Sequence, residues 1–200
     1  MMLINPFMVA PAIPASTKIL MPFTTTSGFV DVAGGHAITV VGTPTIATLA
    51  GVFDAGALLV SPTSYIKVDS TPTLSLGAQV PFTVEFDVYI TVSPYPCGIL
   101  SMRESNVYVP FVINMDGSLI GNSALNAFSG IAASIPLNTK KSIKLVGDGT
   151  NITEYINGVA SATRPHSNWS SIDRFLTIGH DFSGSMTGYI SNFRFSNVAL

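Results

Sequence analysis

From residue 24 to the C-terminus, apolar and polar side chains alternate along many short segments, and this period of two most narrows the possible folds. In residues 82–91 every second side chain is apolar, so an extended chain would have one apolar and one polar face. The same pattern predicts strands at residues 36–41, 64–68, 82–91, 107–115, 141–146, 152–156, 159–163, 175–178 and 189–195. Because each strand must bury one face, the sequence predicts an all-β antiparallel sandwich of two sheets.

Turn sequences separate the predicted strands. Asn157-Gly158 joins residues 152–156 to residues 159–163 through two residues that accept positive φ, which is typical of a two-residue hairpin. Asp116-Gly117 and Ser183-Gly184 are further turn sequences of this kind. The turns therefore favour antiparallel neighbours along much of the chain.

The charge content excludes one class of function and favours another. Charged residues make up 10% of the 200 residues, against about 25% in an average soluble domain. The nine Lys and Arg residues are scattered and the net charge is −2, so the basic stripe that a nucleic-acid-binding protein needs is missing from the sequence. A surface with few charges repels its neighbours weakly, so we expect a homo-oligomer or a component of a larger assembly.

Cysteine and acidic residues give no clear metal or cofactor signal. The single Cys97 excludes an intrachain disulfide, and Pro and Gly around it predict a turn. Asp116, Asp148, Asp173 and Asp181 lie near predicted turns, where calcium could bind, but turn chemistry explains them equally well. We therefore expect no resident metal or cofactor, with calcium as the alternative.

Residues 1–23 differ in composition from residues 24–200 and predict an extended N-terminal arm before the sandwich. This segment is apolar and interrupted by Pro6, Pro11 and Pro14, so neither a signal peptide nor a membrane-spanning helix is expected. A free apolar arm would be poorly soluble, so we expect it to bind a neighbouring subunit. The residues expected to make this contact are Leu3, Ile4, Phe7, Met8, Val9, Ile13 and Leu20.

Four motifs occur in a familiar order: FTVEFDVY at residues 82–89, YINGV at 155–159, LTIG at 176–179 and GYISNFR at 188–194. Together they resemble the laminin-G-like branch of the concanavalin A-like lectin/glucanase superfamily, over about residues 28–200. The resemblance implies a jelly-roll sandwich. Chains of this kind that carry an apolar N-terminal segment are also similar to virion proteins of tailed bacteriophages.

Glu85 and Asp87 raise the question of catalysis. Glycosidases of the resembled superfamily carry three carboxylates on one strand, as Glu-x-Asp-x-Glu or Glu-x-Asp-x-x-Glu. Here the third position is Tyr89 or Ile90, and neither transfers a proton to a leaving sugar. We therefore expect no enzyme activity and a polar strand face in which Glu85 bonds to neighbouring Thr or Arg side chains.

Residues 164–170 contain the candidate glycan site. Trp169 offers an aromatic face, and Arg164, His166 and Asn168 offer hydrogen-bonding groups beside it. Such a set suits the apolar face and hydroxyl edge of a sugar. Alternatively, Trp169 is an anchor in the core or in an interface.

Two functions follow from these patterns together with the resemblance. The first is a non-enzymatic bacteriophage virion protein, as a capsid decoration or tail accessory, which is anchored by the arm and displays the sandwich on the virion surface. The second is a carbohydrate-binding adhesin that recognises host cell-surface glycan. Neither involves nucleic acid or a membrane span.

Overall fold

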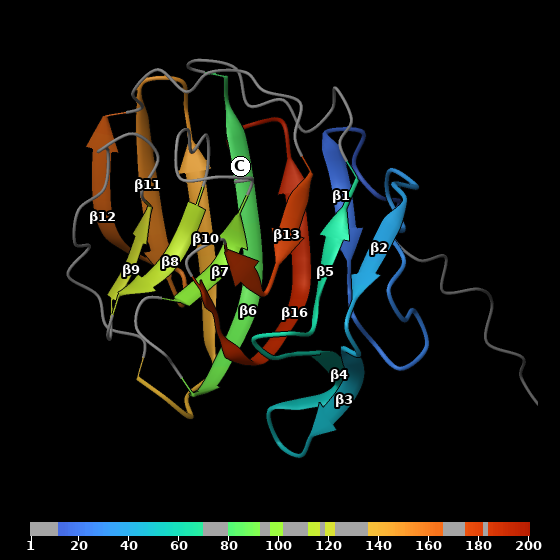
Figure 1. The fold of residues 1–200 in the computed structure, drawn as a ribbon. Helices are drawn as coiled ribbons and strands as arrows, with labels where there is room; N and C mark the ends of the chain where they lie inside the picture. The colour runs from blue at the N-terminus through green and yellow to red at the C-terminus, as the bar shows by residue number, and fades with distance from the viewer. Residues whose placement is uncertain are drawn as a thin grey trace, which may run out of the picture.

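Strands make up the regular structure of the computed structural model, in which two β-sheets stack face to face (Figure 1). The structure describes residues 12–69, 80–92, 97–101, 112–116, 119–122, 136–165, 175–181 and 184–200. Helices are absent from these residues, so no helix there is long and apolar enough to cross a membrane. The predicted all-β sandwich is confirmed.

Sheet A has the order β12-β11-β10-β6-β16-β4-β3, and β1 also pairs with β16. Its strands are β1 (Thr17–Met21), β3 (Thr45–Leu49), β4 (Phe53–Val60), β6 (Phe82–Val92), β10 (Lys141–Gly147), β11 (Asn151–Ile156), β12 (Val159–Pro165) and β16 (Thr187–Ser196). One edge of β16 pairs with β6, and the other edge pairs first with β4 and then with β1. Strands β6 and β16 therefore form the centre of the sheet.

Sheet B has the order β14-β15-β7-β13-β5-β2. In addition, β8 pairs with β7, and β9 pairs with β8. Its strands are β2 (Ile38–Val41), β5 (Tyr65–Val68), β7 (Cys97–Ser101), β8 (Val112–Asp116), β9 (Leu119–Asn122), β13 (Leu176–Ile178), β14 (His180–Asp181) and β15 (Gly184–Ser185). Between β15 and β7 the pairing is parallel. The other pairs in this sheet are antiparallel.

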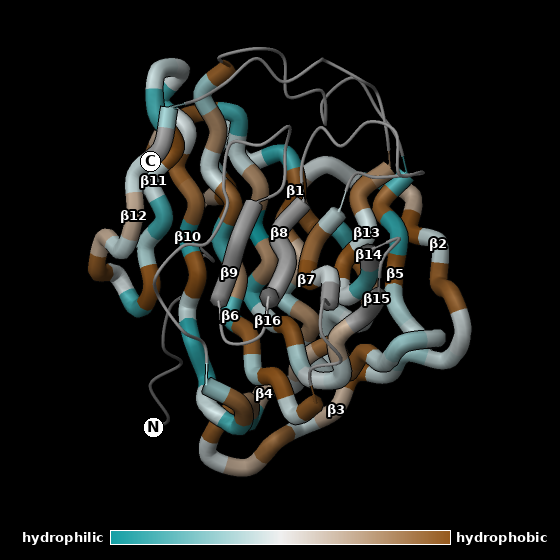
Figure 2. The backbone as a smooth tube through the Cα atoms, turned by 60° about the vertical axis from the view of Figure 1, so that its left-hand side comes forward, coloured by the Kyte–Doolittle hydropathy of each residue, from teal (hydrophilic) through white to brown (hydrophobic). Residues whose placement is uncertain are grey.

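The hydrophobic core lies between the sheets and follows the period of two. Phe82, Val84, Phe86, Val88 and Ile90 of β6 are at most 2% exposed, whereas Glu85, Asp87 and Tyr89 are half-buried. Brown and teal segments alternate accordingly along the strands in Figure 2. Burying one such side chain contributes about 1.5–3 kcal/mol, so the alternation fixes which face of each strand turns inward.

The predicted hairpin at Asn157-Gly158 is confirmed. Both residues have positive φ, 51° and 78°, and they connect β11 to β12. The Asn157 side chain also accepts a hydrogen bond from the backbone N–H of Ser142 in β10, at 3.0 Å. The turn is thereby tied to the next strand of sheet A.

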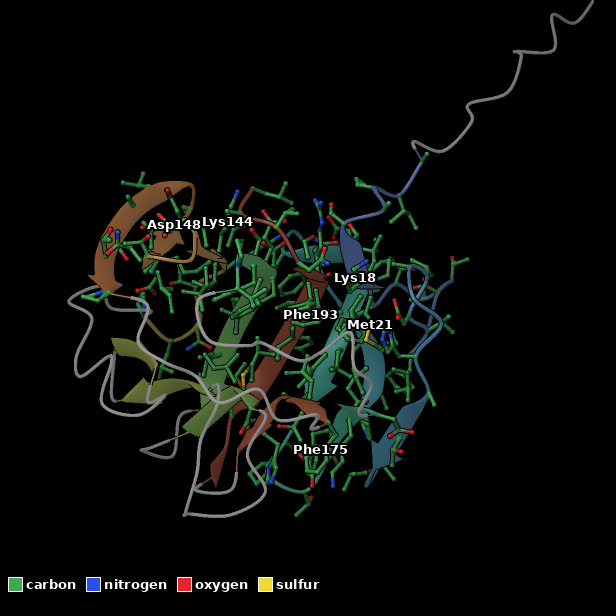
Figure 3. The ribbon with its side chains drawn as sticks, turned by 90° about the horizontal axis from the view of Figure 1, so that it is seen from above. Lys18, Met21, Lys144, Asp148, Phe175 and Phe193 are labelled. Carbon is green, nitrogen blue, oxygen red and sulfur yellow. The ribbon has the colours of Figure 1, made fainter. Side chains whose placement is uncertain are left out.

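The predicted boundary between arm and sandwich at residue 23 requires correction. Strand β1 pairs with β16, and Met21 lies opposite Phe193, as seen in Figure 3. Ile19, Met21 and Phe23 are fully buried in the core. The alternation of these three residues was hidden in the sequence because Pro22 interrupts it and the strand is only five residues long.

The residues predicted to make the arm contact divide between described and undescribed parts of the chain. Leu20 lies in β1 opposite Arg194, and Ile13 precedes β1 with 41% of its surface exposed. Five others lie outside the described residues: Leu3, Ile4, Phe7, Met8 and Val9.

Cys97 begins β7 and pairs with Met115 of β8, so the strand already includes Gly98, whereas Pro94, Tyr95 and Pro96 of the predicted turn lie outside the described residues. Strands β3 and β4 were not predicted. In β4, Gly56, Ala57 and Leu58 are buried in succession, so this strand has no simple alternation to detect.

Candidate functional site

A groove of about 430 Å³ lies on the outer face of sheet A, above the centre of β6. We call it the sheet A groove. Strands β10, β6 and β16 provide its floor, and β1 and the turn at Gly158 provide its sides. Because the apolar side chains of β6 point into the core, the period of two places Glu85 and Asp87 on this outer face.

Glu85 lies between two cations in the groove. Lys144 Nζ on β10 is 3.6 Å from one carboxylate oxygen, and Arg194 Nη1 on β16 is 3.6 Å from the other. Both cations occupy the positions directly opposite Glu85 in the strand register. The predicted contact of Glu85 with an Arg side chain is present as an ion pair, because 3.6 Å is longer than a hydrogen bond.

Asp87 has a separate set of donors. Ser142 Oγ donates a hydrogen bond to one oxygen at 2.5 Å, and Asn192 Nδ2 donates to the other at 2.9 Å. Lys140 Nζ is 3.2 Å from the carboxylate. Asn192 reaches Asp87 because β16 bulges between Ser191 and Arg194, with Asn192 at φ 53°.

The two residues at which a third carboxylate would stand, Tyr89 and Ile90, have their side chains on opposite faces of β6. Ile90 is buried in the core, and Tyr89 lies on the outer face with its ring centroid 6.1 Å from that of Tyr189. Each carboxylate in the groove is held by its own neighbours. The arrangement is a network of fixed donors and acceptors, as expected of a polar strand face.

Aromatic side chains continue the same face beside the groove. Tyr189 stacks on Phe53 at 6.1 Å, and Lys140 Nζ lies 4.8 Å from the centre of the Phe53 ring. Lys140 therefore contacts both Asp87 and the aromatic cluster of Phe53, Tyr89 and Tyr189. Polar groups with defined positions next to aromatic rings are characteristic of ligand sites.

The glycan site predicted from the sequence lies mostly outside the described residues. This holds for His166, Asn168 and Trp169, while the backbone of Arg164 lies in β12, opposite Ile152 at the edge of sheet A. The sheet A groove was not predicted, because its residues come from five segments that are distant in the sequence. The alternation of apolar and polar residues was the one available signal. It indicated that Glu85 and Asp87 lie on the outer face of the sheet, but not which side chains surround them.

Of the four possible calcium ligands, Asp148 is the one whose side chain the structure describes. Asp148 accepts hydrogen bonds from the backbone N–H groups of Thr150 and Asn151, at 2.7 and 2.6 Å, which is a turn role. Asp116 and Asp181 lie in β8 and β14, and Asp173 is outside the described residues. Within the part of the chain that the structure describes, no three His, Cys, Asp or Glu side chains form a group able to hold a metal ion.

Asp31 is a buried carboxylate with a structural role. It accepts hydrogen bonds from the backbone N–H groups of Leu20, Ala33, Gly34 and His36, and His36 Nδ1 lies 2.5 Å from it. Burial alone would raise the pKa of Asp31, but these bonds outweigh it and lower the pKa. The carboxylate thus fastens residues 31–36 to β1.

Glu154 is a second buried carboxylate among the described residues, and it lies on the core side of β11. It is 0% exposed and stands opposite Leu145 of β10 and Ala162 of β12. Neither carboxylate oxygen has a hydrogen-bond partner within the described residues. Burial raises the pKa of Glu154 to about 7, and the nearby Ser161 hydroxyl offsets this only in part.

Comparison with known proteins gives the fold but no family. No family model and no curated protein sequence matches the chain. Among solved structures, domain 4 of AbnA, a GH43 extracellular arabinanase from Geobacillus stearothermophilus in complex with arabinotriose, superposes with a TM-score of 0.73 and 16% identity. The match covers 92% of this chain and 94% of that domain.

Clostridial toxin domains are also similar. The binding domain of botulinum neurotoxin DC, in complex with rat synaptotagmin II, has a TM-score of 0.71 and 15% identity over 94% of this chain and 50% of that one. A structure of botulinum neurotoxin type C, whose cell entry is described as dependent upon interaction with two ganglioside molecules, has a TM-score of 0.69 and 15% identity over 92% of this chain and 48% of that one. The chain thus spans about half of these toxin chains and shares a β-sandwich fold with them.

Proposed function

We propose that this chain is a non-enzymatic carbohydrate-binding module and that the sheet A groove binds the sugar. The observation that carries this proposal is the network around Glu85 and Asp87, in which carboxylate, amide, hydroxyl and cationic groups from three adjacent strands line one groove. Sugar hydroxyls both donate and accept hydrogen bonds, so they pair with such a mixed set.

Rigidity and size also suit a sugar ligand. The side chains are mounted on hydrogen-bonded strands and already contact one another, so binding orders few additional groups. A volume of about 430 Å³ falls in the usual range of about 300–1,000 Å³ for small-molecule sites. The half-buried rings of Tyr89 and Tyr189 beside the groove offer apolar surface to the C–H face of a sugar ring.

The groove favours binding over hydrolysis. A retaining glycosidase needs two carboxyl groups about 5–5.5 Å apart, one as nucleophile and one as acid. Asp87 is occupied by Ser142, Asn192 and Lys140, and Glu85 is paired with two cations. The similarity to an arabinanase domain bound to arabinotriose, and to a toxin that interacts with gangliosides, supports the sugar class of ligand.

Calorimetric titration of the full chain with arabinotriose and a panel of cell-surface oligosaccharides tests this function. Asp87→Asn should weaken binding about tenfold or more, because a charge-assisted acceptor is lost. Thr153→Val on β11, where the hydroxyl contacts Thr163 outside the groove, is the control and should bind like the wild type. Absence of binding to every oligosaccharide by the wild-type chain would contradict the proposal.

We also propose that the module is displayed on the surface of a bacteriophage virion and that its N-terminal segment anchors it there. The low charge content and the exposed apolar side chains near β1, Ile13, Val30 and Val32, support an assembly contact in this region. Light scattering of the full chain and of a chain starting at Ala12, which keeps β1, tests the proposal. The same oligomeric state for both would contradict it.

A further inference from the structure

A second cavity, of about 340 Å³, adjoins the sheet A groove at the end of β16. Leu20 and Arg194 line both cavities, so the two are neighbours on the outer face of sheet A. The remaining walls of the second cavity are formed by Thr17 of β1 and residues 12–14 before it. We call this cavity the Arg194 pocket.

Two buried polar atoms at this pocket lack partners. Arg194 Nε and Thr17 Oγ1 are inaccessible to solvent and have no hydrogen-bond partner among the residues described. Thr17 is 6% exposed. By contrast, Thr83 on the same outer face donates its hydroxyl to the Val198 carbonyl and accepts from the Leu200 N–H. Buried donors are nearly always paired, so a missing partner at a cavity indicates a ligand group.

The charges around the pocket define the sign of that ligand group. The single carboxylate of Glu85 faces both Lys144 and Arg194, while Asp87 is balanced by Lys140. The groove therefore carries one more positive than negative charge, although the whole chain has a net charge of −2. The 3.6 Å between Arg194 Nη1 and Glu85 is also longer than a hydrogen bond, so the guanidinium keeps donors for another anion.

Apolar and polar walls together define the ligand class. Leu20, Ile13 and Pro14 offer apolar surface, and the unpaired donors of Arg194 and Thr17 lie at the same cavity. A carboxylate-bearing sugar has both complementary features, an anionic group and an apolar ring face.

We propose that the Arg194 pocket binds the carboxylate of an acidic sugar, of the uronate or sialate class, while the remainder of the oligosaccharide lies in the sheet A groove. The guanidinium of Arg194, whose side chain is 28% exposed, donates hydrogen bonds to the carboxylate, the Thr17 side chain turns to add its hydroxyl, and Leu20 contacts the ring. This inference rests on the proposed function, since it names the class of glycan that the groove selects.

The test is titration of the full chain with uronate- and sialate-containing oligosaccharides, each paired with its carboxyl-reduced, neutral counterpart. The acidic member of a pair should bind at least tenfold more tightly. Arg194→Gln should weaken binding of the acidic member about tenfold to a hundredfold and so remove most of its advantage over the neutral member. Thr17→Val keeps the shape of the side chain and should weaken acidic-sugar binding about threefold to tenfold.

Ser196→Ala is the matched control. Ser196 lies opposite Thr17, and its buried hydroxyl also lacks a partner in the described part of the chain, but it does not line the pocket. Neither Ser196→Ala nor Thr17→Val should lower the denaturation midpoint, because each removes an unpaired buried hydroxyl. Ser196→Ala should also leave sugar binding unchanged.

Three outcomes separate this inference from the proposed function. Preference for the acidic members, reduced by Arg194→Gln and Thr17→Val but not by Ser196→Ala, supports the inference. Equal or tighter binding of the neutral members overturns it and leaves the carbohydrate-binding function standing. Failure of every oligosaccharide to bind overturns both.

Discussion

Glu154 should make the stability of this protein fall as the pH rises from about 4.5 to about 7. In the unfolded chain the carboxyl ionises near its ordinary pKa of 4.5, whereas burial on the core side of β11 raises the pKa to about 7 in the folded chain. The folded state therefore holds a proton that the unfolded state has released, so the stabilisation is complete below pH 4.5 and is lost as the pH rises through 7. At 1.36 kcal/mol for each pKa unit, the loss is at most about 3 kcal/mol.

Urea denaturation of the wild type and of Glu154→Gln, at intervals between pH 5 and pH 8, measures this effect. Gln keeps the shape and cannot ionise, so the variant should lose most of the pH dependence and be more stable than the wild type at pH 8. Leu145→Val, at the position opposite Glu154, is the control. It should cost about 1 kcal/mol at every pH and keep the wild-type slope.

A stability profile of Glu154→Gln that parallels the wild type from pH 5 to pH 8 would refute this reasoning. It would mean that the carboxyl ionises equally easily in both states, although it is 0% exposed and its oxygens have no partner within the described residues. Direct titration of the Glu154 carboxyl by carbon-13 NMR gives an independent reading of the folded pKa. A midpoint near 4.5 would have the same consequence.

Two further predictions concern the packing of the sandwich. Asp31→Asn should lower the free energy of unfolding at pH 7 by about 2–4 kcal/mol in urea denaturation, because the buried N–H donors lose a carboxylate acceptor. The stabilisation by the wild-type carboxylate is present above the ordinary pKa of 3.8 and is lost as the pH falls through its lower pKa in the folded protein. If the variant lost stability in acid as steeply as the wild type, this role of Asp31 would be contradicted. Gly179→Ala should lower the free energy of unfolding by about 2–4 kcal/mol in the same assay, because φ is +89° and a Cβ would lie 2.5 Å from a methyl group of Val60 in the opposite sheet. An unchanged denaturation midpoint would contradict this close approach.

The fold could be predicted from the sequence wherever one face of a strand is buried and the other is not. Strand β6 shows this most clearly, since its core residues occupy every second position from Phe82 to Ile90. The hairpin at Asn157-Gly158 was predictable because a two-residue turn of this type requires residues that accept positive φ. These signals are local, so they survive without knowledge of the tertiary structure.

The strands that the sequence did not predict were missed for different physical reasons. Strand β4 buries three successive residues from Gly56 to Leu58, so its pattern does not alternate. Strand β1 is bounded by Pro14 and Pro22, and only its pairing with β16 distinguishes it from an extended arm. In both strands the tertiary partner, not the local pattern, determines the structure.

The candidate site shows where local reasoning ends. The alternation in β6 places Glu85 and Asp87 on the outer face, but it says nothing about what surrounds them. Ser142 is 55 residues from Asp87 along the chain and Asn192 is 105 residues away, and both reach it only through strand register and through the bulge in β16. A sequence search for function favours a conspicuous residue such as Trp169, whereas a recognition surface on a sheet is distributed over ordinary polar residues of several strands. The carboxylates therefore predicted the polar face, and only the pairing of β10, β6 and β16 makes that face a groove able to hold a ligand.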